Sequence, residues 1–184
     1  MEFHNNYMNI QKQSLVEFHD IDNSAKLAII KLWSSTIGEV MIITFIGHSS
    51  LITCDNLLAK IKKTILDNTK ADENISFFCG GYGEFDNLSV LACRFVKEER
   101  PNGEIVFVTP YLNGVKNFEY YDGIIYPPIE GVPPKYAIIK RNEWMIDKAD
   151  LVIAYVKHKY GGAYKSLLCA QKRKKLIINL AESE

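Results

Sequence analysis

Three glycines and two carboxylates lie within one short segment, Cys79-Gly80-Gly81-Tyr82-Gly83-Glu84-Phe85-Asp86. An apolar run precedes this segment and a helix-like pattern follows it, so a strand, a tight turn and a helix start are expected in that order. Such a turn points backbone N–H groups and the positive end of a helix at an anion, and glycine lets a ligand approach the main chain. We therefore predict a phosphate-binding turn in which Gly80, Gly81, Tyr82 and Gly83 contact the ligand.

Glu84 and Asp86 are the candidate catalytic residues, because both carboxylates belong to this turn. Asp86 either caps its helix, accepts a hydrogen bond from a ribose hydroxyl or acts as a general base. Glu84 either does similar work or faces solvent. The sequence leaves these alternatives open.

A second candidate binding segment is Lys140-Arg141-Asn142-Glu143-Trp144-Met145. Trp144 and Met145 indicate the buried side of a helix, and Arg141 stands one turn before Met145. An arginine placed there leans into a cleft, where its planar guanidinium suits a phosphate or a carboxylate. We expect Arg141 and its neighbour Asn142 to bind the ligand, the alternative being a solvated helix arginine.

Further candidates follow the ends of other predicted strands. His48 either contacts a phosphate or a sugar, or is an inert loop side chain. Lys157 and His158 either neutralise a phosphate or decorate a surface loop. The remaining candidates are glycines, a proline and a tyrosine at strand ends: Gly47, Pro110, Tyr111, Gly161 and Gly162.

Apolar runs alternate with helical patterns from residue 41 onward, which predicts parallel strands covered by helices on both faces. The predicted strands are 41–46, 75–79, 104–108, 151–155 and 175–180, and the predicted helices are 55–66, 86–97, 134–148 and 161–172. The expected fold class is α/β, a Rossmann-like doubly wound sheet of about five parallel strands in the order 3-2-1-4-5. Ligands bind beyond the carboxyl ends of such strands, at the switch point between the first and fourth strands.

Two regions depart from this alternation. The loop 112–133 is long for the fold and contains Tyr120, Tyr121 and Tyr126, so it is either a wall that stacks on a flat ligand or a packed surface loop. Residues 1–40 precede the α/β domain predicted at 41–184. They form an N-terminal extension, which is a short helix, an interface arm or upstream sequence before an internal start at Met41.

The totals restrict the class of protein. Lys and Arg number 22, as do Asp and Glu, so net charge gives no support for nucleic-acid or membrane binding. No apolar run reaches the ~18 residues of a membrane-spanning helix, and the start is no signal peptide, which predicts a soluble, cytoplasmic protein. No Cys, His and carboxylate spacing matches a metal site. P-loop, nucleophile-elbow and dinucleotide-binding spacings do not occur, so neither a metal nor a cofactor is expected.

Five segments match a known family in type and order: Thr44-Phe45-Ile46-Gly47-His48, the glycine turn at 79–86, Pro110-Tyr111, residues 140–145 with Asp150, and Tyr160-Gly161-Gly162-Ala163. From Met41 to its end, the chain thereby resembles the YpsA-like branch of the SLOG superfamily, which also contains the Lonely Guy phosphoribohydrolases and the Smf-type DNA-processing proteins. The resemblance implies a Rossmann-like cleft that binds a nucleotide or a nucleotide-derived ligand, NAD-derived signals included. Such folds often pair through helices, so a homo-oligomer is expected.

The same resemblance lowers the expectation of catalysis. Lonely Guy enzymes cleave the N-glycosidic bond of a nucleoside monophosphate with an arginine in R-K-x-x-M and a glutamate in P-G-G-x-G-T-x-x-E. Arg141 and Met145 fit the first segment, whereas Leu168 occupies the glutamate position of the second. Because leucine neither stabilises an oxocarbenium ion nor activates water, a binding protein acting as a sensor or sequestering module is expected first. An N-glycosidase that uses Glu84 or Asp86 is the alternative. A DNA-processing accessory protein, supported by the basic run 172–175, is a further one.

Overall fold

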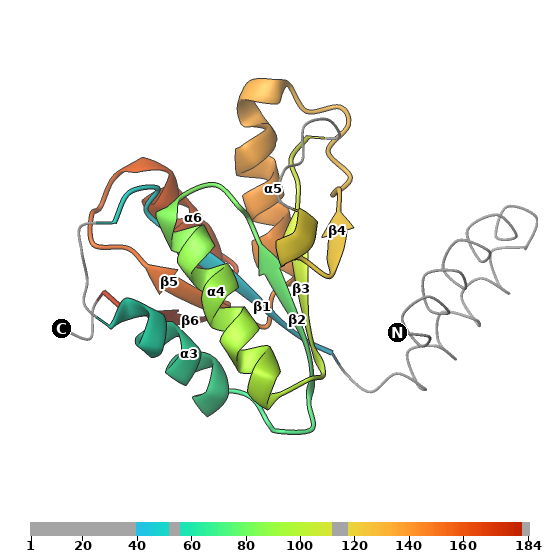
Figure 1. Ribbon diagram of the computed structural model, residues 1–184. Coiled ribbons are helices and arrows are strands. Elements are labelled where there is room, and N and C mark those ends of the chain that lie inside the picture. Colours follow the sequence, from blue (N-terminus) through green and yellow to red (C-terminus); the bar gives the residue numbers. More distant parts are fainter. Residues whose placement is uncertain (1–39, 52–55, 112–117, 182–184) are drawn as a thin grey trace, which may run out of the picture. The chain divides into compact units, whose positions relative to one another are not determined.

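The computed structural model describes residues 40–51, 56–111 and 118–181, which form one α/β unit (Figure 1). Residues 1–39 of the predicted N-terminal extension, Cys54 and part of the long loop lie outside these residues, whereas Val40 already belongs to the first strand. Cys79 and Cys93 are buried in the core, as their apolar surroundings in the sequence predicted.

Six parallel strands form one sheet in the order β4-β3-β2-β1-β5-β6. Their bounds are β1 Val40–Gly47, β2 Asn74–Cys79, β3 Gly103–Val108, β4 Gly123–Ile125, β5 Leu151–Tyr155 and β6 Leu176–Asn179. The five predicted strands are present in the predicted order, and β4 is an additional edge strand that pairs with β3. Its three residues, Gly-Ile-Ile, are too few to show the periodicity on which a sequence-based prediction depends.

Helices cover both faces of this sheet (Figure 1). Their bounds are α3 Leu57–Asp67, α4 Glu84–Glu99, α5 Pro134–Lys148 and α6 Gly161–Lys172, and a 3-10 helix, η1, spans Phe118–Tyr120. The pair α3 and α4 packs on one face, and the pair α5 and α6 on the other. On α3, for example, Leu57, Ile61 and Ile65 recur at helical spacing and are buried in the core. Among the described residues, none of the helices combines the length and apolar composition that a bilayer span requires.

The direction of winding reverses between β1 and β5, which are neighbours in the sheet. The chain leaves β1 toward α3 on one face and leaves β5 toward α6 on the other, so the two following loops separate at this point. Asp150 strengthens the junction, because its Oδ2 accepts from the N–H of Ile42 at 2.8 Å and its own N–H donates to the Ile42 carbonyl at 2.8 Å. A structural role therefore accounts for Asp150.

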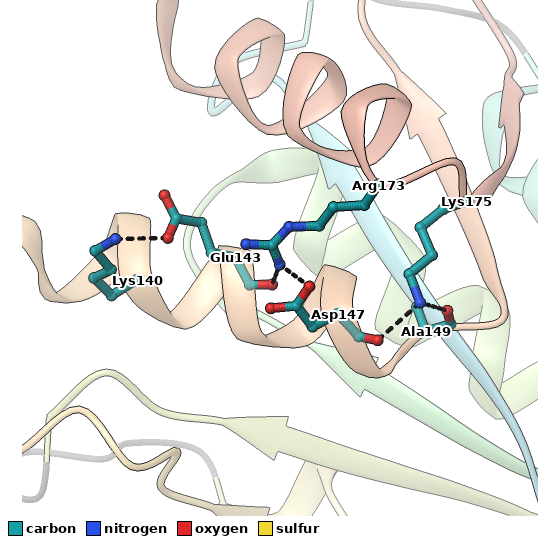
Figure 2. A network of polar contacts seen from close by, with 6 residues as sticks. All are labelled: Lys140, Glu143, Asp147, Ala149, Arg173 and Lys175. Atoms are coloured by element: carbon teal, nitrogen blue, oxygen red, sulfur yellow. Dashed lines mark hydrogen bonds and ion pairs between the residues drawn. The ribbon is translucent and has the colours of Figure 1, made fainter.

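The basic run 172–175 begins at the last residue of α6. Two of its side chains bind the α6–β6 turn to α5, as Figure 2 shows. Arg173 forms an ion pair with Asp147 and donates to the carbonyl oxygen of Glu143 at 2.5 Å. The Nζ of Lys175 donates to the carbonyl oxygens of Asp147 and Ala149, each at 2.8 Å. The last carbonyls of a helix lack helical partners, so Lys175 satisfies the carboxyl end of α5, and Arg173 joins the same helix one turn earlier. Two of the four cations in the run thus stabilise the fold.

Candidate functional site

A pocket of about 360 Å³ opens beyond the carboxyl ends of the central strands. Its volume falls within the roughly 300–1,000 Å³ of small-molecule sites. The lining residues come from the ends of β1 and β2, from one face of α5 and from the start of α6: Phe45, Ile46, Gly47, His48, Ser49, Gly80, Tyr82, Asp86, Ile138, Arg141, Asn142, Met145, Tyr160, Gly161, Gly162, Ala163 and Ser166. The pocket lies at the switch point where the topology predicted a site.

The fold brings most of the sequence-predicted binding residues to this pocket. Those that line it are Gly47, His48, Gly80, Tyr82, Asp86, Arg141, Asn142, Gly161 and Gly162. Those that do not are Gly81, Gly83, Glu84, Pro110, Tyr111, Lys157 and His158. Gly81 and Gly83 are instead needed for the backbone conformation of the turn. Their φ angles are +70° and +139°, in a region that other residues rarely adopt.

Neither Tyr111 nor two tyrosines of the long loop, Tyr120 and Tyr121, line the pocket. The Tyr111 hydroxyl donates to the Pro134 carbonyl at 3.3 Å. Tyr121 packs on Phe107 with ring centroids 5.0 Å apart. The guanidinium carbon of Arg94 lies 5.4 Å from the centroid of the Tyr120 ring. No described residue of the long loop lines the pocket. The described part of this loop therefore fits the packed alternative.

Arg141 is the buried cation of the pocket. Its residue is 1% exposed, and Nη1 donates to the Val108 carbonyl at 3.2 Å. Its Nε is buried and has no hydrogen-bond partner among the described residues. The guanidinium also lies 5.2 Å from the ring centroid of Tyr82. Burial lowers the pKa of Arg141, and the nearby Asp86 carboxyl opposes this change. A buried cation with an unsatisfied donor is costly unless a ligand supplies the acceptor.

The amino-terminal end of α6 forms another wall of the pocket, and its first turn contains no acidic residue. Its N-cap, Tyr160, makes no side-chain capping bond. A Cβ on Gly161 or Gly162 would meet nothing within 4 Å, so the first turn borders open space. The first N–H groups of a helix lack helical partners and carry the positive end of its dipole. This wall therefore suits a negatively charged group.

The start of α4 differs, because two carboxylates, those of Glu84 and Asp86, belong to its first turn. The Oδ2 of Asp86 accepts from the N–H of Tyr82 at 2.7 Å. The Oε2 of Glu84 accepts from the N–H of Leu51 at 2.5 Å, which directs this side chain outside the pocket lining. Burial raises the pKa of Asp86, while the Tyr82 N–H and Arg141 oppose the rise. Of the two candidate carboxylates, only Asp86 faces the pocket.

Gly80 lies beside both the guanidinium of Arg141 and the carboxyl group of Asp86. A Cβ on Gly80 would lie 2.5 Å from Nη1 of Arg141 and 2.8 Å from Oδ2 of Asp86. The absent side chain is what lets both groups approach the same turn. Gly80 is therefore needed for the arrangement of the site.

His48 joins the two loops that flank the switch point. Its Nε2 accepts from the N–H of Lys157 at 3.1 Å and from the N–H of His158 at 3.5 Å. An Nε2 that accepts carries no proton, so the ring is neutral with its hydrogen on Nδ1. Burial, and then the neighbouring His158, lower the pKa of His48 from 6.5. His48 therefore lines the pocket, but its Nε2 is already hydrogen-bonded to the backbone.

The lowered pKa of His48 predicts a pH-dependent stability. As the pH falls below 6.5, the unfolded chain binds a proton at His48 before the folded one does, so the free energy of unfolding decreases. Glutamine offers an uncharged acceptor that does not titrate. We expect His48→Gln to lose less stability than the parent in urea unfolding between about pH 7.5 and about pH 5. Identical pH slopes for the two proteins would contradict this assignment.

Sequence reasoning missed several lining residues that helical spacing indicates. Ser166 stands one turn after Gly162 on α6, and Ile138 stands one turn before Asn142 on α5. The Nδ2 of Asn142 donates to the Oγ of Ser166 at 3.4 Å and joins the two helices at the pocket. Extending each motif by one turn would have found both residues. Among the described residues, no three His, Cys, Asp or Glu side chains gather as a metal site.

Comparison with known proteins gives structural likeness only. No protein-family model matches the sequence, and no curated protein matches it significantly. The molybdenum cofactor carrier protein of Chlamydomonas reinhardtii is 16% identical, with a TM-score of 0.52 over 77% of each chain. DprA, the DNA processing protein A of Streptococcus pneumoniae, is 13% identical with a TM-score of 0.54, over 75% of this chain and 49% of DprA. The protein TM1055 is 14% identical with a TM-score of 0.51, over 74% of this chain and 72% of TM1055. At these identities the likeness shows a shared Rossmann-like α/β fold alone, and it establishes neither the SLOG superfamily nor its YpsA-like branch.

Proposed function

We propose that this protein binds a nucleotide or nucleotide-derived ligand in the pocket at the switch point, and that it acts as a sensor or sequestering module. The observation that carries the proposal is Arg141, which is 1% exposed, lines the pocket and has a buried Nε without a partner among the described residues. An oxygen-rich anion supplies the acceptors that this guanidinium lacks.

We place the phosphate of this ligand between Arg141 and the start of α6. The glycine turn after β2 was expected to cradle it, but Asp86 already accepts from the N–H of Tyr82 in that turn. A second anion beside this carboxylate would be repelled. The first turn of α6 contains no acidic residue and borders open space at Gly162. Asp86 then faces the sugar, where an ionised carboxylate accepts hydrogen bonds from hydroxyl groups.

Titration with adenosine 5′-monophosphate (AMP), monitored by calorimetry, tests the proposal directly. Mass spectrometry of the recovered ligand then shows whether AMP is bound intact. We expect saturable binding and intact AMP, because Leu168 stands at the position of the Lonely Guy glutamate and, of the two candidate carboxylates, Glu84 does not line the pocket. No binding of AMP or of ribose 5-phosphate would overturn the proposal, and release of adenine would assign an enzyme instead.

An N-glycosidase is the second candidate, and Asp86 is the observation that favours it. This carboxyl lines the pocket and burial raises its pKa, as a group that exchanges protons requires. Leu168 is 44% exposed and does not line the pocket, so the position that resembles the Lonely Guy glutamate lies away from the ligand here. If the parent releases adenine from AMP, Asp86→Asn should abolish the release and leave binding nearly intact.

DNA binding is a weaker candidate. Its support in the sequence was the basic run 172–175, and Arg173 and Lys175 use their cationic groups to hold α5. Binding to single-stranded DNA that falls steeply with salt in a shift assay would revive it.

A further inference from the structure

Tyr160 is an exposed aromatic residue at the edge of the pocket. It is 71% exposed and lines the pocket, and it is the N-cap residue of α6. A single exposed aromatic residue needs no explanation by itself. This one directly precedes the helix turn on which we place the phosphate. In a nucleotide, one sugar carries both phosphate and base, so a base bound here lies within reach of the Tyr160 ring.

The Tyr160 ring is held in place from one side. The His158 ring stacks against it, with centroids 5.3 Å apart and an interplanar angle of 13°. His158 in turn lies 5.2 Å from the His48 ring, and its own N–H donates to Nε2 of His48 at 3.5 Å. This row of rings orients Tyr160 before a ligand arrives, and His158 covers only one face. The 71% exposure leaves ring surface available to a ligand.

We propose that Tyr160 is the stacking platform for the base of the ligand, so that the protein selects phosphate-bearing ligands with a planar heteroaromatic ring over sugar phosphates alone. This inference rests on the proposed function and adds the part of the ligand that is recognised. Aromatic side chains bind bases through their π-faces, and the stacking buries ring surface that water otherwise contacts.

Other tyrosines near the pocket are less suited to this role. The Tyr82 ring, which is 43% exposed, already packs against the buried guanidinium of Arg141 at 5.2 Å. Tyr111 lies outside the pocket lining, and so does Tyr136 on α5, which is 48% exposed. Tyr136 is therefore a matched control, because it is an exposed tyrosine close in sequence to the α5 face of the site but not part of the pocket.

Calorimetric titrations with two probes, AMP and ribose 5-phosphate, test the inference. We expect the parent to bind AMP more tightly than ribose 5-phosphate. Tyr160→Ala should weaken AMP binding by roughly 5- to 150-fold, the range for losing one base–aromatic stack, and change ribose 5-phosphate binding less than about twofold. Tyr160→Phe keeps the π-face and should retain AMP binding, as should Tyr136→Ala. Thermal unfolding of each variant confirms that it is folded.

Each other outcome has a distinct meaning. If the parent binds neither probe, the proposed function fails and the stacking role fails with it. If the parent binds both probes equally, or if Tyr160→Ala leaves AMP binding unchanged, ligand binding stands and the stacking role is overturned. An equal loss for both probes in Tyr160→Ala also overturns it, because the residue would then act on the phosphate end.

Discussion

Arg141→Met is expected to weaken the binding of AMP by about 100-fold or more. Removing one partner of a buried charged hydrogen bond costs about 2–5 kcal/mol, which is roughly 30- to several thousand-fold in affinity. Arg141 is buried beside Met145, and a methionine of adaptable shape fills much of the same space. Because the variant also removes a buried cation with an unsatisfied Nε, we expect it to stay folded. Calorimetric titration with AMP measures the loss, and urea unfolding checks the fold.

Lys140→Met is the matched control for this variant. Lys140 precedes Arg141 on the same helix, its side chain is 50% exposed, and its Nζ pairs with Glu143 at 2.8 Å (Figure 2). Such exposed pairs contribute little to stability, so both affinity and folding should be unchanged. Arg141→Lys is expected to lose most of the affinity too, because an ammonium keeps the charge and loses the planar fork. If Arg141→Met bound AMP as tightly as the parent does, the placement of the phosphate beside Arg141 would be wrong.

Gly47→Ala is expected to destabilise the fold by about 3 kcal/mol, the upper end of the cost of overpacking a core. A Cβ at Gly47 would lie 2.2 Å from two ring atoms of Phe85 and 2.5 Å from its Cβ. Phe85 is 1% exposed and stacks on Tyr155 with centroids 6.0 Å apart, so its ring has no empty space to enter. The start of α4 would have to move away from β1. Urea unfolding of the variant and the parent measures the change.

Gly131→Ala is the corresponding control. A Cβ on Gly131 would meet nothing within 4 Å, and its φ lies outside the region that favours glycine. Its stability should stay within about 0.5 kcal/mol of the parent, as for most surface substitutions. If Gly47→Ala changed the free energy of unfolding equally little, the inferred close packing of β1 against α4 at Gly47 would be contradicted.

Local patterns were sufficient to predict the core strands and helices. The runs that became β1, β2, β3 and β5 are mostly apolar because both faces of those strands are buried, and all but β2 are rich in β-branched residues. This signal is contained in consecutive residues. Alternation with helices then determined parallel pairing and the order of five strands. The edge strand β4 was missed, because three residues in a long loop obtain their pairing from β3 rather than from their own pattern.

Residue types and spacing also identified most of the pocket lining. Arg141 was predicted from its position one turn before Met145, and the structure places it, buried, in the lining. The sequence could not assign partners, since these depend on segments far apart in the chain. Glu84 bonds to Leu51, and His48 accepts from the backbone 109 residues later. Both were candidate site residues. Tertiary contacts direct Glu84 outside the pocket lining, and they engage Nε2 of His48 with the backbone while its residue stays in the lining.

The glycine turn after β2 shows the same division. The strand, the flexible turn and the helix start were predictable from consecutive residues, because glycine content and apolar periodicity are local properties. The contact of Asp86 with the N–H of Tyr82, four residues earlier, is local as well. The tertiary structure was needed to show that Arg141 of α5 and the acid-free start of α6 line the same pocket. Electrostatic preference depends on distances between side chains from different elements, and the packing of α5 and α6 against the sheet sets those distances.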